Sequence, residues 1–258
     1  MAVLAEIPTI VKNIGGVVVA ILLWEAVRMS GWVDPRDLPS FFAIVRSAVD
    51  GLSGGDLSWA VLATILSWAP GLLLAVVIGI AAGVALALLP RLESATRPLL
   101  EFLRPIPSVA LIPVALLTLG VGMEMQLVMI AFASVWPILF STKAGVESVD
   151  PRYRETGRVF GLGTASQIVR IVLPNALPSV ATGTRTASAI ALVLAITVEM
   201  LTGRPGIGFY LQNVRLNGLV TEMWAAILVT GVLGYLVNAA FMTLERLTLP
   251  WSPENRGH

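Results

Sequence analysis

The sequence predicts an all-α protein that crosses a lipid bilayer about six times, and three observations support this fold class. Of the 258 residues, 56% are hydrophobic and 13% are charged, about half the charge of a typical soluble domain. The mean hydropathy is +0.85. Several long stretches contain no charged residue at all. A water-soluble fold could not cover its surface with so few charges, so the excess apolar surface requires lipid.

The charge-free stretches locate the crossings. A hydrocarbon core about 30 Å thick needs roughly 20 helical residues. The candidate runs are residues 57–90, 105–123, 125–142, 186–198 and 223–244, and the apolar stretch 13–32 adds a sixth. The run at 57–90 is longer than one span, so we expect its start to lie in the interface or to begin a long tilted helix before Pro70. Glu25 and Arg28 follow the N-terminal apolar residues without a cleavage site, which indicates a retained span.

The positions of the basic residues predict the orientation. With the N-terminus in the cytoplasm, the inner segments collect twelve of the 17 Lys and Arg residues and the outer segments five. This bias favours a cytoplasmic N-terminus. An even number of crossings then places the C-terminus in the cytoplasm as well.

The chain lacks the residues that common enzyme motifs and cysteine or histidine metal sites need. The chain has no Cys, and its one His is His258 at the C-terminal end. It contains no phosphate-binding loop with its lysine, no His-Glu-x-x-His and no Gly-x-Ser-x-Gly. A net charge of +1 gives no indication of nucleic-acid binding. We therefore expect no catalytic residue, no metal site and no cofactor in this chain.

Small residues recur at every fourth position in two of the predicted spans. In lipid, such rows let helices approach closely. One row is Gly71, Ala75, Gly79, Gly83 and Ala87, and the other is Gly183, Ala187, Ala191 and Ala195. Chance is the alternative, because Gly and Ala are abundant here. The functional reading is that these helices line a tightly packed, movable core.

A polar segment, residues 143–180, carries its own helix signals. Asp150 followed by Pro151 predicts a helix start, with a capping carboxylate and proline at the first helical position. Gly161 and Gly163 predict its end, because glycine tolerates the left-handed conformation of a helix exit.

A second short helix is expected directly afterwards. Thr164 and Gln167 have the spacing of a capping box. Pro174 and Pro178 are expected to stop this helix. The segment therefore predicts two short helices joined by a glycine bend on the cytoplasmic face, a shape suited to docking into a partner.

This segment resembles the cytoplasmic loop of the permeases of binding-protein-dependent ABC importers. The family pattern is Glu-Ala-Ala, three residues, Gly, nine residues, Ile, one residue and Leu-Pro. At the same spacing this chain has Glu155, Thr156, Gly157, Gly161, Ile171, Leu173 and Pro174. Thr156 and Gly157 replace two alanines, and Gly157 should cost the helix about 1 kcal/mol relative to Ala.

Other stretches are similar to the nitrate, taurine and alkanesulfonate branch of this family, and the resemblance covers roughly residues 15–250. These stretches are residues 103–113, 136–139, 173–179, 198–200 and 206–210. The resemblance implies the permease fold of type I ABC importers, with one transmembrane permease domain over residues 1–258 and a coupling loop at 143–180. It also implies the plasma (inner) membrane of a bacterium and a small, anionic solute.

The resemblance further implies partners. Two permease chains, expected to be identical, would enclose the pathway, and two cytoplasmic ATPase subunits would bind ATP and Mg and each receive one loop. An extracytoplasmic binding protein would deliver the solute. Glu155 would anchor the loop in the ATPase and Gly161 would set the bend, while Ile171 and Leu173 would pack against the membrane helices. Arg158 is a candidate ionic contact or a solvated arginine.

Glu199 is a carboxylate within a predicted span, where charge is costly and faces protein or water. It lies one helical turn beyond Ala195, so we expect it to face other helices. One interpretation is a pathway or gate residue near the outer mouth. The other is an interhelical hydrogen bond or an ion pair with Arg204 or Arg215.

Two smaller groups are interpreted as structural. Glu25 and Arg28 have the spacing of a contact along one helix face. The methionines near the outer end of another span favour adaptable packing over a ligand role. These are Met123, Met125 and Met129.

Two other classes remain open. The first is a secondary transporter or channel driven by an ion gradient without an ATPase, although no internal repeat supports one built from inverted halves. The second is a membrane scaffold that transports nothing.

Overall fold

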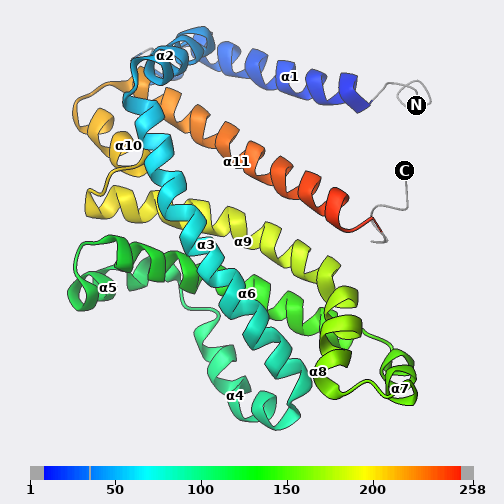
Figure 1. Ribbon diagram of the computed structural model, residues 1–258. Coiled ribbons are helices and arrows are strands. Elements are labelled where there is room, and N and C mark those ends of the chain that lie inside the picture. The colour runs from blue at the N-terminus through cyan, green and yellow to red at the C-terminus, as the bar shows by residue number, and fades with distance from the viewer. Residues whose placement is uncertain (1–8, 35, 251–258) are drawn as a thin grey trace. The chain divides into compact units, whose positions relative to one another are not determined.

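The computed structural model describes residues 9–34 and 36–250, and within these ranges every regular element is a helix (Figure 1). The all-α prediction is therefore confirmed. The elements are α1 (Thr9–Met29), α2 (Phe41–Gly54), α3 (Asp56–Leu88), α4 (Pro90–Leu103), η1 (Ser108–Leu111), α5 (Ile112–Leu119), α6 (Met123–Glu147), α7 (Pro151–Val159), α8 (Thr164–Gln167), η2 (Ile168–Val172), α9 (Leu173–Thr202), α10 (Ile207–Leu216) and α11 (Val220–Thr248).

Four helical stretches in the described part are long and apolar enough to cross a membrane. They are Asp56–Leu88, Met123–Glu147, Thr164–Thr202 and Val220–Thr248. A fifth crossing results if Pro90–Leu103 and Ser108–Leu119, which are bent by 85° at their junction, act as one span. The 21 residues of α1 match the predicted first span in length, and their membrane crossing stays a prediction.

The expected crossing at 105–123 is not a single straight helix. The structure divides this run between η1 and the eight-residue α5, and α5 is too short to cross alone. Pro105, Pro107 and Pro113 lie in or beside these elements. Proline lacks the backbone donor that a continuous helix needs, which explains the broken geometry.

The long run at 57–90 forms one continuous helix. The 33 residues of α3 begin at Asp56 and pass through Pro70 without a break. At 1.5 Å per residue, α3 is about 50 Å long, well beyond the hydrocarbon thickness. The alternative of a long helix that starts before Pro70 is therefore confirmed.

The described residues form two compact units. The described residues of one unit are 9–34, 36–59 and 210–231, and those of the other are 60–209 and 232–250. In the first unit, the rings of Trp24 and Trp224 meet edge to face with centroids 4.8 Å apart. Both indole N–H groups donate to backbone oxygens, at Pro39 and Asp37 respectively. These contacts join α1 and α11 to the loop before α2.

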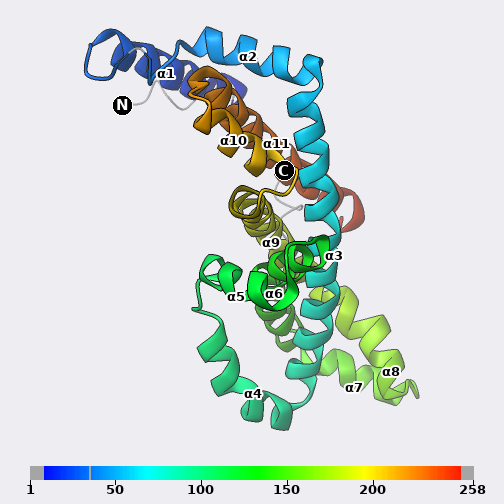
Figure 2. The same ribbon diagram turned by 90° about the vertical axis from the view of Figure 1, so that its left-hand side faces the viewer.

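The second unit has its core where α3, α6 and α9 meet. The buried side chains at its centre are Leu72, Ala75, Ile130, Ala131, Ile138, Ala187, Ala191 and Ala195. Figures 1 and 2 both show α6 and α9 running side by side. This unit contains the polar loop and Glu199, the two features that the sequence analysis singled out.

The small-residue rows produce the predicted close packing. A Cβ atom at Gly71 would lie 2.7 Å from the Ile130 side chain, and one at Gly79 would lie 2.8 Å from that of Ile138. Such distances are shorter than real contacts, so only glycine fits. The row on α3 therefore faces α6, and the prediction of close backbone approach is confirmed.

The row on α9 also packs closely against α6. A Cβ atom at Gly183 would lie 2.6 Å from the Ser141 Cβ atom. Conversely, a Cβ atom at Gly145 on α6 would lie 2.7 Å from the Cβ atom of Ser179 on α9. Each helix thus presents a glycine to a small residue of the other, so the two backbones are as close as side chains allow.

Candidate functional site

The polar segment begins with the helix that the sequence predicts. The Asp150 carboxylate accepts a hydrogen bond of 2.9 Å from the backbone N–H of Arg152, and Pro151 is the first helical residue. After Val159 the chain leaves the helix, and Gly161 has a φ of +74°. The predicted start and glycine bend are therefore confirmed.

The second helix begins differently from the capping-box prediction. Gly163 occupies the N-cap position of α8, and no side chain caps this end. The Gln167 amide instead donates a 2.7 Å hydrogen bond to the carbonyl of Leu162. The Gln167 side chain therefore reaches from α8 back to the bend and holds the turn at Leu162.

The prediction that two prolines stop this helix is wrong. α8 runs through the π-helical turn η2 directly into α9, which contains Pro178. Pro174 lies in the first turn of α9, where the missing backbone donor matters least. The changed hydrogen-bond register of η2 precedes it, and such π-turns occur frequently at functional sites. The loop therefore continues into α9 without an interruption of helical structure.

Gly157, one of the two departures from the family pattern, lies against the second helix. A Cβ atom there would be 2.8 Å from the Ile171 Cδ1 atom and 3.3 Å from the Gln167 Cγ atom. Glycine therefore admits a closer approach of α7 to η2 than alanine would. This contact offsets part of the helix propensity that glycine loses.

The outer surface of α7 is exposed and partly apolar. Glu155, Thr156 and Arg158 are exposed, and among the described residues Glu155 and Arg158 form no ion pair. Three large apolar or aromatic side chains beside them are also exposed, namely Tyr153 (56%), Val159 (86%) and Phe160 (78%). Ile171, Leu173 and Pro174 are half-buried. A soluble protein rarely exposes such a cluster without a partner.

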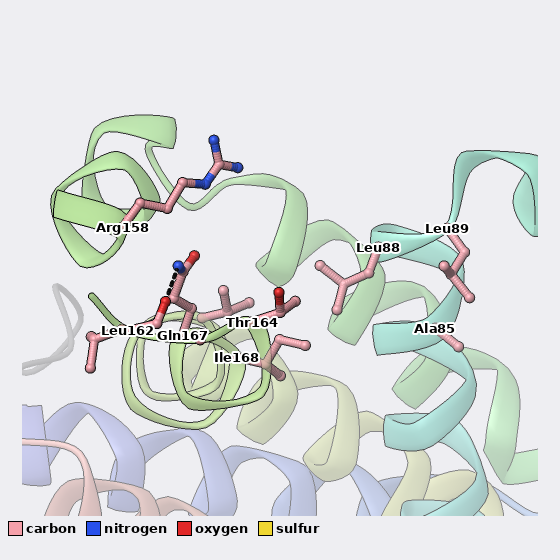
Figure 3. Close-up of a pocket in the computed structure, with 10 residues that line it drawn as sticks. Ala85, Leu88, Leu89, Arg158, Leu162, Thr164, Gln167 and Ile168 are labelled. Carbon is pink, nitrogen blue, oxygen red and sulfur yellow. Dashed lines mark hydrogen bonds between the residues drawn. The ribbon is translucent and has the colours of Figure 1, made fainter. Parts of the chain in front are cut away.

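A cavity of about 660 Å³ separates this bend from the end of α3 (Figure 3). Arg158 enters it from α7, and Leu162, Thr164, Gln167 and Ile168 line it from the bend and the second helix. The opposite wall is formed by Ala85 and Leu88 of α3 and by Leu89, which directly follows that helix. Arg158 is thus the one basic side chain among the described residues that line this cavity.

Glu199 lies near the other end of α9 and is fully buried. Its Oε2 atom accepts hydrogen bonds from the Thr64 hydroxyl (2.9 Å) and from the backbone N–H of Gly208 (3.1 Å). Its Oε1 atom is 3.2 Å from the Gln126 amide nitrogen and 3.3 Å from the Ser67 hydroxyl. The carboxylate makes the interhelical hydrogen bonds of the second interpretation, and the gate role stays a prediction.

Of the two expected cationic partners, Arg204 is linked to Glu199 only through Gln126. Arg204 donates from Nε to the Gln126 side-chain oxygen at 2.9 Å, and the Gln126 amide nitrogen faces Glu199. Arg215 instead lies 3.5 Å from Gln212 within its own unit. The described partners of Glu199 are therefore neutral donors.

Glycine is required where the chain passes over Glu199. A Cβ atom at Gly206 would overlap the Glu199 carboxyl group. One at Gly208 would overlap the backbone oxygen of Ile196 and lie 2.7 Å from the Met200 nitrogen. The Gly-Ile-Gly stretch is thus seated directly on the end of α9.

The partners of Glu199 were missed in the sequence. Thr64, Ser67 and Gln126 are all polar residues in charge-free runs, and each is at most 2% exposed. Polar side chains within apolar spans are costly unless paired, which is the signal that could have drawn attention to them. Their common partner could not have been deduced, because Thr64 and Glu199 lie 135 residues apart.

The predicted contact between Glu25 and Arg28 is present, and the packing prediction holds for two of the three methionines. Arg28 pairs with Glu25 at 2.6 Å, and Glu25 also accepts the backbone N–H of Phe41. Met125 and Met129 are buried in an apolar cluster. Met123 is exposed at 38%, and its sulfur lies 3.8 Å from the Arg204 guanidinium.

Curated relatives align with nearly the whole chain. The Synechocystis sp. protein "Bicarbonate transport system permease protein CmpB" is 30% identical over 252 residues, covering 93% of this chain and 89% of the relative. The Escherichia coli protein "Putative aliphatic sulfonates transport permease protein SsuC" is 30% identical, covering 90% and 89%. A Synechocystis sp. nitrate import permease protein is 27% identical, covering 94% and 90%.

A solved structure has the same fold. It shows the methionine ABC transporter MetNI in an inward-facing conformation, and the matching chain superposes with a TM-score of 0.59 at 19% identity, covering 81% of this chain and 97% of that one. The family model described as "Binding-protein-dependent transport system inner membrane component" matches residues 75–251. This chain therefore belongs to that family, the membrane permeases of ABC importers.

Proposed function

We propose that this chain forms, with a second and identical copy, the path by which a small anion enters a bacterial cell. Its relatives are named for bicarbonate, nitrate, aliphatic sulfonates and taurine, which share a compact group of negatively charged oxygens. An extracytoplasmic binding protein delivers the solute. The permease lies in the inner membrane with both termini in the cytoplasm, as the distribution of its basic residues favours.

Residues 143–180 act as the coupling loop, the contact for a separate ATPase that binds ATP and Mg. One observation carries this assignment, namely the bend that exposes the family's glutamate beside large apolar side chains. Glu155 is exposed, and so are Tyr153, Val159 and Phe160. An apolar patch with a charged residue at its edge is the usual composition of a docking site. Glu155 anchors the loop, and Arg158 is the candidate second ionic contact.

The inner side of the same loop fixes its shape. Gly161 supplies the bend with its positive φ, and Ile171 packs against Gly157. Leu173 and Pro174 are the first two residues of α9. Because the loop continues into a membrane helix without a break, closure of two ATPase subunits on ATP would move α9 along with the loop.

The experiment is uptake into proteoliposomes that contain the purified chain with or without its ATPase subunits. Radiolabelled bicarbonate, nitrate and taurine are offered in turn with the cognate binding protein. We expect uptake of one of them only when the ATPase and ATP are present. Uptake that needs an ion gradient and no ATPase would favour the secondary transporter or channel instead.

The substitution Glu155→Arg tests the docking role. The reversed charge on an exposed, unpaired position leaves the fold intact, so the chain should still insert in the membrane. Recovery of the ATPase on co-purification should fall about tenfold or more, the effect of a lost charged contact at an interface. The control is Glu124→Arg, also exposed but at the first turn of α6, at the opposite end of that helix from the loop. Unchanged assembly and uptake of the Glu155 variant would refute the assignment.

A further inference from the structure

α9 connects the coupling loop to the buried carboxylate of Glu199. The helix begins at Leu173, within the 143–180 segment and directly after η2, and continues to Thr202. Glu199 is therefore roughly 39 Å along the helix from Leu173 at 1.5 Å per residue. A continuous helix transmits displacement along its axis, so whatever Glu199 holds moves with the loop.

We propose that Glu199 is a positioning residue that joins the outer ends of α3, α6 and α9 to the 206–208 turn, so that movement of the loop opens and closes the outer face. This inference rests on the proposed function, because it takes the loop as the ATPase contact. The residues that make the joint are Thr64, Ser67, Gln126, Glu199 and Gly208.

The hydrogen bonds to the Glu199 carboxylate hold the elements of the joint together. The carboxylate accepts from the Thr64 hydroxyl, the Gln126 amide and the Gly208 backbone, with the Ser67 hydroxyl also within reach. A carboxylate that is buried from solvent is stabilised by each of these donors. Pulling any single element away would leave a buried carboxylate underpaired, so these elements move together.

Thr64 contacts both Glu199 and the 206–208 turn. Its hydroxyl donates to Glu199 and also accepts the backbone N–H of Ile207 at 2.9 Å. The 206–208 turn is thus held twice, by Glu199 through Gly208 and by Thr64 through Ile207. The glycines at 206 and 208 leave no space for a side chain between the turn and α9.

Gln126 extends the joint to the chain before the turn. Its amide nitrogen faces Glu199 and the Ser67 hydroxyl, which leaves its oxygen to accept from Arg204. Because the carboxylate accepts hydrogen bonds and cannot donate, it determines which way this amide points. Arg204 is therefore positioned through Gln126.

The test compares Thr64→Val with Thr64→Ser in the complete complex in proteoliposomes. Valine keeps the shape of threonine and removes the hydroxyl, whereas serine keeps the hydroxyl and loses one methyl group. The readouts are complex yield, ATP hydrolysis without binding protein, and its stimulation by binding protein loaded with the anion that the wild type takes up. With valine we expect normal yield, basal hydrolysis within about twofold and stimulation about tenfold lower, whereas serine should restore the stimulation.

Each other outcome is decisive. Equal stimulation in the valine and serine variants would overturn the proposal, as would a parallel fall of yield, basal and stimulated hydrolysis that points to folding alone. If the valine variant fails to assemble, Ser67→Ala takes its place under the same criteria. It removes the longest contact to Glu199 together with the contacts of the Ser67 hydroxyl to the Gln126 amide and the Thr64 carbonyl. Glu124→Gln, an exposed carboxylate at the same end of α6, should behave like the wild type. Wild-type uptake without any ATPase would refute the proposed function rather than the joint.

Discussion

Replacing Gly183 with alanine tests how tightly α6 and α9 are packed. In an isolated helix this change is stabilising by about 1 kcal/mol, because alanine is the better helix former. Here the new Cβ atom would lie 2.6 Å from the Ser141 Cβ atom and 2.9 Å from the Pro137 carbonyl oxygen. The Pro137 oxygen is backbone and cannot rotate away, so packing should reverse the sign of the effect.

The size of the effect follows from the separation that is needed. To change the 2.6 Å distance to an ordinary contact of 3.4 Å, the helices must move apart by about 0.8 Å. A gap of that size forfeits roughly a quarter to a half of each dispersion contact across it. Ala187, Ala191 and Ala195 continue the same fully buried row and would share the loss. Overpacking costs about 1–3 kcal/mol, so after the helix gain of about 1 kcal/mol we expect a net loss of about 1 kcal/mol and at most about 2 kcal/mol.

The assay is reversible unfolding of the purified chain in mixed detergent micelles, followed by tryptophan fluorescence. The matched control is Gly231→Ala within α11, where nothing lies within 4 Å of the new Cβ atom. The control should be unchanged or more stable by up to about 1 kcal/mol. If Gly183→Ala is as stable as the wild type or more so, the close packing deduced from the glycine positions is refuted.

Two further predictions concern the coupling loop. Gly161→Ala places a side chain at a φ of +74°, which costs about 1–2 kcal/mol locally, so ATPase recovery should fall, whereas Gly163→Ala, at a φ of −64° with open space around it, should recover the ATPase normally. Equal recovery of both variants would contradict the role of the bend. Asp150→Ala removes the cap on α7 and should destabilise that helix by about 1 kcal/mol. Hydrogen exchange should then speed up at the first amides of α7 with no change in global unfolding, and unaltered exchange would show that the cap is dispensable.

Local signals in the sequence predicted much of the candidate site. Asp150 and Pro151 mark a helix start because both act within the first turn, and Gly161 marks the bend because its backbone angle is a local property. The capping box at Thr164 failed although its spacing is correct. The Gln167 amide instead donates to the Leu162 carbonyl across the glycine bend. The path of the chain through that bend cannot be deduced from the spacing of Thr164 and Gln167.

The proline signals show the limit of such reasoning. Pro174 and Pro178 are helix breakers in an isolated chain, yet α9 contains both. Membrane helices tolerate proline because neighbouring elements and local changes of register satisfy the freed backbone groups. The π-helical turn at Ile168–Val172 is such a change of register, and it depends on how the loop packs against the helix.

By itself, the sequence determined the membrane class, the small-residue rows and the exposed loop with its glutamate. These properties follow from composition and from spacing within one helix. Only the tertiary structure decided what Glu199 touches, because its donors come from α3, α6 and the 206–208 turn, and Thr64 is 135 residues away. A buried charge must be paired with hydrogen-bond donors, but the sequence does not show which residues supply them. The close packing of α3, α6 and α9 brings these donors to the end of α9, and so determines which residues Glu199 contacts.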